Sequence, residues 1–183
     1  KEKIVNLYLK SGHEVAVHGK KHLALTNVSA AIATNDVLND RITLEEMTGS
    51  IVTGMAYAYG AYNDEVVEIL KNCGIEYART VSSTENFDIP EDWLRLPPTC
   101  HHNNPRLMEL AHLFVEDSTA SQNPKLFYLW GHSFEFNRQD NWEVIEEFAE
   151  FIGNRDDIWY ATNIEIYKYA KAFERLEFSA DGS

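Results

Sequence analysis

The sequence predicts a parallel α/β fold, and two observations lead to this prediction. Segments whose apolar residues recur at helical spacing alternate along the chain with short segments rich in β-branched and aromatic residues. The strongest short segment, residues 125–130, is a nearly continuous apolar run, which is typical of a parallel strand buried on both faces. The alternation is compatible with an open doubly wound sheet and with part of a barrel. The length of 183 residues favours one domain and makes two conceivable.

The first half of the chain shows the alternation most regularly. Gly12 stops a helix predicted over residues 3–11, and Asn63 caps a helix that stops at Gly74. The same pattern predicts a strand at 14–18, a helix over 27–48 in one or two pieces, and strands at 51–57 and 75–79.

The second half begins with a proline-containing loop, in which a short strand near residues 94–96 is expected. Thr162 and Glu165 match a capping box that opens the last helix. The other expected elements are a helix over 105–116, the strand at 125–130 and a strand at 158–161. Asp140 or Asn141 is expected to cap a further helix that reaches Ile152 and stops at Gly153. The pattern indicates five strands and leaves a sixth open.

Composition and charge exclude several classes of protein. The 44% hydrophobic content exceeds what disordered chains carry. The 16 Lys+Arg residues face 29 Asp+Glu, and a net charge of −13 repels nucleic acid and anionic membrane surfaces. No apolar run approaches the roughly 20 residues that span a bilayer.

The ends of the chain and its cysteines say less about function. Cys73 and Cys100 form neither a disulfide framework nor a CxxC motif, so the redox compartment stays open. The chain begins at Lys1 without a methionine or a signal peptide and stops in a turn-like stretch. We therefore expect a fragment of a longer protein.

Polar side chains follow several of the predicted strands. His18 ends the first strand, Tyr59 follows the strand at 51–57, and His132 comes just after the strand at 125–130. His101 and His102 follow the segment near residue 94. Because the carboxyl ends of parallel strands lie on one face, we expect these groups to gather at one rim.

The histidine pairs allow more than one interpretation. His18 and His22 form an HxxxH motif, which suits two ligands of one metal ion but also describes two surface histidines. His101 and His102 could bind metal or substrate, or cap a loop. For His132, the preceding glycine allows a close backbone approach and favours a site over a structural role.

Several segments together resemble the polysaccharide deacetylases of carbohydrate esterase family four. Residues 12–22, GHEVAVHGKKH, resemble the family's metal-binding segment, where a "GHE" strand leads into H-[ST]-x-x-H. Residues 55–63 occupy the place of the R-x-P-Y-G motif, and residues 129–132 that of a strand ending in L-x-H. The chain is most similar to the predicted xylanase/chitin deacetylase branch, especially at residues 77–81, 98–103 and 130–133.

This resemblance implies a partial, distorted (β/α) barrel of seven or eight strands. It implies that His18 and His22 hold a divalent metal, usually zinc, which would polarise an acyl carbonyl and lower the pKa of a bound water. The expected activity is metal-dependent removal of acetyl groups from N- or O-acetylated carbohydrate.

The resemblance also assigns roles to other residues. The backbone N–H of Tyr59 would stabilise the oxyanion, and His132 would protonate the leaving group. We expect Trp130, His101 and His102 to contact an acetylated oligo- or polysaccharide.

Three departures from the family pattern limit this expectation. The family's Asp-containing first motif, with the third metal ligand and the base, would precede Lys1. Ala56 and Ala58 replace the arginine and proline of R-x-P-Y-G, and the fourth motif is only faint at residues 92–93. We therefore expect this chain alone to be incompetent, with open sheet edges that allow self-association.

The sequence leaves two rival hypotheses open. One is a catalytically inactive carbohydrate-binding pseudoenzyme on the same fold, which the replacement at Ala56 favours. The other is a metal-dependent barrel enzyme of different chemistry, such as a sugar isomerase. The family-like order of the motifs favours the deacetylase.

Overall fold

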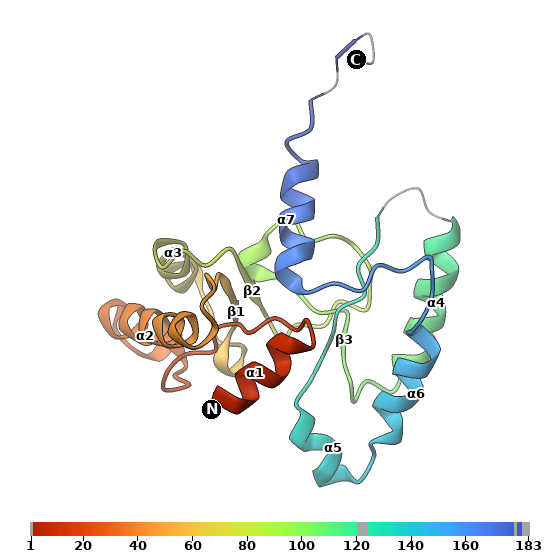
Figure 1. Cartoon of the computed structure of the whole chain (residues 1–183), viewed down its shortest axis with the longest axis horizontal. Coiled ribbons are helices and arrows are strands. Elements are labelled where there is room, and N and C mark those ends of the chain that lie inside the picture. The colour runs from red at the N-terminus through yellow and green to blue at the C-terminus, as the bar shows by residue number, and fades with distance from the viewer. Residues whose placement is uncertain (1, 121–123, 178, 181–183) are drawn as a thin grey trace. The chain divides into compact units, whose positions relative to one another are not determined.

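The computed structural model describes residues 2–120, 124–177 and 179–180 (Figure 1). The chain divides into two compact units, and each is described by itself. The first unit comprises Lys1–Arg79, Trp93–Arg95 and Tyr160–Ser183, and the second comprises Thr80–Asp92 and Leu96–Trp159. In the described part of the chain, no helix has the length and apolar character needed to cross a membrane.

The first unit surrounds a small parallel sheet. Strand β1 (Gly54–Ala56) pairs with β2 (Tyr77–Arg79) in register Met55 with Ala78, and Val17 makes a parallel bridge to Met55. The other elements are the helices α1 (Glu2–Lys10), α2 (Ala30–Thr48), α3 (Asp64–Asn72) and α7 (Asn163–Phe173), and the 3-10 turns η1 (Leu25–Asn27), η2 (Ala58–Gly60) and η3 (Trp93–Arg95).

Close packing of apolar side chains holds this unit together. Val17, Met55 and Leu70 are all but completely buried in one cluster, to which α2 and α3 contribute one face each. Gly54 is required where β1 passes Tyr77, because a Cβ on it would lie 2.3 Å from the tyrosine oxygen. The position of the sheet therefore depends on the burial of apolar side chains and on the close contact of Gly54 with the Tyr77 side chain.

The second unit is built on a shorter parallel pair. Strand β3 (Cys100–His101) pairs with β4 (Leu129–Trp130), so that His101 lies opposite Trp130. Helices α4 (Leu107–Ala120) and α6 (Glu143–Ile152) pack side by side, and α5 (Ser133–Gln139) leads from β4 toward α6 (Figure 1). Aromatic rings of Phe87, Phe114 and Phe127 form the centre of the core.

Most of the predicted elements are present. The helix caps are confirmed at Asn63, whose side chain accepts the Val66 N–H at 2.9 Å, and at Thr162, which forms the expected capping box. Gly153 ends α6 as predicted. The helix predicted over 27–48 is a single helix, α2, preceded by the turn η1.

Several strand predictions were wrong in extent or in type. The strand at 14–18 is a single bridge at Val17, and near 94–96 residues 93–95 form the turn η3 while Leu96 alone makes a bridge. In the run at 125–130 only Leu129 and Trp130 form a strand, and its residues are half-buried rather than buried on both faces. Residues 158–161 join no strand ladder within the described part of the chain. A β-branched or aromatic run forms a strand only where a neighbouring segment supplies backbone partners. Helix α5 was not predicted, because its seven residues are too few to show a helical period.

Candidate metal and active-site residues

The HxxxH segment of the first unit brings its two imidazoles together. His18 Nε2 and His22 Nε2 lie 3.1 Å apart. The other ring nitrogen of His18, Nδ1, lies 2.8 Å from the carbonyl oxygen of Ala56, which can only accept a hydrogen bond. Nδ1 therefore carries the proton, and Nε2 keeps a lone pair for a ligand, the usual arrangement of a metal-binding histidine.

The distance between these two nitrogens suits one tetrahedral ion. Zn–N bonds of 2.0–2.1 Å place two nitrogens of a tetrahedral site about 3.3 Å apart. Burial lowers the pKa of His18 from its ordinary value, and the hydrogen bond to Ala56 opposes this shift. The neutral imidazole, which is the form that binds metal, is therefore favoured at His18. The residues present fit a divalent metal.

Two aspartates on α2 hold the histidine loop from behind. Asp40 Oδ2 accepts the backbone N–H of His18 at 2.9 Å, and Asp36 Oδ1 accepts that of Lys21 at 2.9 Å. Asp36 is only 4% exposed, so its carboxylate is buried beneath the loop. Sequence reasoning missed both residues, although their i, i+4 spacing on one face of a predicted helix was a usable signal.

His22 and Tyr59 share an unusual backbone conformation. Their φ angles are 54° and 57°, in the left-handed region that costs a residue with a side chain about 1–2 kcal/mol. Their rings meet edge to face with centroids 4.5 Å apart. Backbone strain of this kind is common at functional sites. His22 and Tyr59 are both candidate site residues from the sequence, and both have this conformation.

A second cluster lies in the second unit around Glu135 of α5. The carboxylate oxygen Oε2 is 3.2 Å from His101 Nε2, 3.3 Å from His102 Nε2 and 3.4 Å from His132 Nδ1. Burial raises the pKa of Glu135, but the neighbouring His101 and His132 outweigh it and bring the pKa below its ordinary value. The carboxylate is therefore ionised at neutral pH. The ligand atoms of His101, His102 and Glu135 lie within 4.8 Å of one another, so this group could hold a metal ion.

His102 is the buried member of this cluster. Its side chain is 2% exposed, and burial lowers its pKa. Gly131 makes room for the ring, because a Cβ there would lie 1.8 Å from His102 Nδ1. The expectation that Gly131 permits a close approach is thus confirmed, and the group that approaches is an imidazole.

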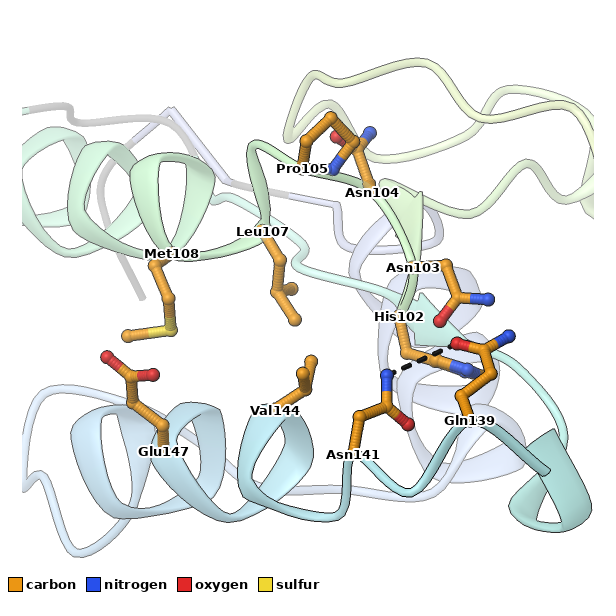
Figure 2. A pocket seen from close by; sticks show the side chains of 10 residues that line it. All are labelled: His102, Asn103, Asn104, Pro105, Leu107, Met108, Gln139, Asn141, Val144 and Glu147. Carbon is orange, nitrogen blue, oxygen red and sulfur yellow. Dashed lines mark hydrogen bonds between the residues drawn. The ribbon is translucent and has the colours of Figure 1, made fainter. Parts of the chain in front are cut away.

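A pocket of about 440 Å³ opens beside His102 (Figure 2). Leu107 and Met108 of α4 face Val144 and Glu147 of α6 across it (Figure 2). Its remaining lining is rich in carboxamides, from Asn103, Asn104, Gln139 and Asn141, together with Pro105. Such a lining offers hydrogen bonds to an uncharged polar ligand.

The predicted site residues therefore fall into two groups. His18, His22 and Tyr59 meet in the first unit. His101, Trp130 and His132 lie near one another in the second, where the ring centroids of His101 and Trp130 are 4.6 Å apart and those of Trp130 and His132 5.8 Å apart. The convergence of His132 with His18 and His22 on one rim stays a prediction.

Comparison with known families supports the resemblance. Residues 1–78 match the model of the family described as polysaccharide deacetylase. Residues 1–78 are therefore similar to part of a polysaccharide deacetylase domain. The match covers less than half of the 183 residues, and the xylanase/chitin branch stays a prediction. A comparison with curated proteins finds no match.

Solved structures share the fold over nearly the whole chain. A Mycobacterium smegmatis structure described as a polysaccharide deacetylase is 18% identical with a TM-score of 0.67, over 97% of this chain and 70% of its own. A structure described as Puue allantoinase is 14% identical with a TM-score of 0.72, over 96% and 65%. At these identities the likeness shows the α/β fold and not the activity.

A third structure shows why fold alone does not decide activity. A Bacillus anthracis protein described as a pseudoenzyme of carbohydrate esterase family four is 14% identical with a TM-score of 0.55, over 91% of this chain and 50% of its own. The chain spans only 31% of a Bacillus cereus polysaccharide deacetylase.

Proposed function

We propose that the protein is a metal-dependent hydrolase that removes acetyl groups from N- or O-acetylated carbohydrate. The observation that carries this proposal is the His18–His22 pair, whose facing Nε2 atoms are 3.1 Å apart inside the segment that matches the deacetylase family. A divalent metal, zinc in our proposal, would supply Lewis-acid chemistry at the acyl carbonyl when bound there. His18 and His22 would hold it, with Asp40 fixing the His18 backbone.

The remaining roles are assigned to this chain's own residues. Tyr59, which lies against His22, would direct its backbone N–H at the developing oxyanion. His132 would give a proton to the leaving amine or alcohol, with Glu135 beside its Nδ1. Trp130 and His101 would contact the sugar, and His102 would do so only at the edge that lines the pocket, since its side chain is nearly buried.

For the fold, we propose that the chain forms part of a distorted (β/α) barrel with seven or eight strands. The parallel pairing of β1 with β2 and of β3 with β4 supports it, as does the likeness to deacetylase structures. We also propose that residues 1–183 form one deacetylase-like catalytic domain.

The test is acetate release from acetylated chito- and xylo-oligosaccharides by the full-length protein, with and without added zinc. We expect zinc-dependent release that His18→Ala lowers by at least 100-fold, because the metal loses a ligand. His112→Ala is the matched control, since His112 lies exposed on α4. Sugar binding without acetate release would refute the enzyme and support an inactive carbohydrate-binding protein.

A further inference from the structure

The cluster around Glu135 has the composition of a transition-metal site. We propose that His101, His102 and Glu135 bind a second divalent ion, zinc, without using His18 or His22. Two imidazoles and one carboxylate are a common set of three protein ligands for zinc. All three residues lie in the second unit, and His18 and His22 lie in the first. His101 and His102 are also the proposed sugar contacts, so the proposal is tested by metal binding and not by acetate release.

The spacing of the ligand atoms fits an ion. In a tetrahedral zinc site, bonds of 2.0–2.2 Å to nitrogen and oxygen place the two ligand atoms about 3.3–3.4 Å apart. Glu135 Oε2 lies 3.2 Å from His101 Nε2 and 3.3 Å from His102 Nε2. One ligand atom from each of the three residues lies within 4.8 Å of the other two. Three protein ligands leave a fourth position for water or another ligand.

A second observation points to an ion rather than to hydrogen bonds alone. His102 Nε2 and Glu135 Oε2 are buried and 3.3 Å apart, yet within the described residues neither atom has a partner with good hydrogen-bond geometry, and a further neighbour of Oε2, His132 Nδ1, is 3.4 Å away. Buried polar atoms are nearly always satisfied, so these two require an explanation. A cation between them would satisfy both atoms, because the nitrogen lone pair and the carboxylate would point at it and not at each other.

The fold holds His102 in place for this role. Its backbone N–H donates to the Trp130 carbonyl at 2.9 Å, and its ring lies against Gly131, where a Cβ would come within 1.8 Å of Nδ1. The ring also packs on Phe136 of α5, with centroids 4.3 Å apart. The imidazole is therefore oriented before any ligand arrives, which lowers the entropic cost of binding.

His101 adds a feature that the experiment can use. The backbone N–H of Asn103 donates to His101 Nδ1 at 3.1 Å, so in the metal-free chain the ring proton of neutral His101 is on Nε2. Metal binding at Nε2 moves that proton to Nδ1 and removes the acceptor of the Asn103 N–H. Losing one such hydrogen bond lowers the metal affinity by about fivefold.

The experiment is a metal titration of the full 183-residue chain with His18→Ala and His22→Ala combined. Zinc is followed by calorimetry and cobalt by its visible absorption. We expect one equivalent of metal to remain bound, and the Asn103 amide resonance to shift as it binds. Adding Glu135→Gln, which is nearly isosteric, lowers the affinity at least tenfold, and Glu150→Gln on the exposed face of α6 does not.

Each result decides the proposal. His102→Gln repeats the test from the other side of the site, and circular dichroism confirms that each variant is folded. The proposal is wrong if the double alanine variant binds no metal, or if its bound metal is indifferent to Glu135→Gln. If the unmutated chain binds one equivalent of metal, and either His18→Ala or Glu135→Gln alone abolishes this binding, the two groups share a single ion. That result would also overturn the proposal. Failure of acetate release alone leaves these results unchanged.

Discussion

Gly131 and His102 offer a sharp test of packing in the second unit. In Gly131→Ala, the new Cβ would lie 1.8 Å from His102 Nδ1, whereas ordinary contact begins at 3.4 Å. The ring would have to retreat by about 1.6 Å, half of its 3.3 Å distance to Glu135. Overpacking of this kind costs about 1–3 kcal/mol. We expect the free energy of unfolding to fall by that amount.

The assay is urea unfolding of a double-mutant cycle. His102→Ala removes the ring, so adding Gly131→Ala to it should cost less than about 0.5 kcal/mol. The coupling between the two positions should therefore be about 1–3 kcal/mol. Equal losses from Gly131→Ala in both backgrounds would refute the reasoning, since the clash would then involve some other group.

Three further predictions concern the first unit. Burial raises the pKa of the Glu14 carboxyl above its ordinary value. The contribution of this group to the free energy of unfolding is therefore full below about pH 4.5 and is lost as the pH rises through the folded-state pKa. Glu14→Gln should flatten the resulting decline in the free energy of unfolding, measured from pH 4 to 7. Asn63→Ala removes the N-cap of α3 and should cost about 1 kcal/mol in urea unfolding, and a neutral result would contradict the cap. Asp40→Ala leaves the His18 N–H without its acceptor, and calorimetry should show zinc affinity lower by about fivefold.

Local signals in the sequence predicted the helices well. The caps at Asn63 and Thr162 depend only on residues within one turn, and both are formed. The strands were less predictable, because pairing depends on distant partners. Val17 bridges to Met55, 38 positions along the chain, and nothing near Val17 reveals how short that pairing is.

The candidate site divides in the same way. The spacing of His18 and His22 allowed a pair as one of two interpretations, and the tight loop between them brings the rings together. Glu135 could not be found by the same means. It lies three residues after His132 on a helix too short to detect, and its link to His101 depends on the pairing of β3 with β4.

One hydrogen-bond pair bears on the order in which the chain can fold. Glu14 accepts the Tyr77 hydroxyl with one carboxylate oxygen and the Ile164 N–H with the other, across 150 positions of sequence. Residues that complete the first unit are thus made after the second unit, which is encoded between the pieces of the first. During synthesis from the N-terminus, residues 80–159 leave the ribosome before the first unit can be completed. The inserted unit can therefore collapse first, and until Ile164 emerges Glu14 lacks the backbone N–H that its second carboxylate oxygen accepts.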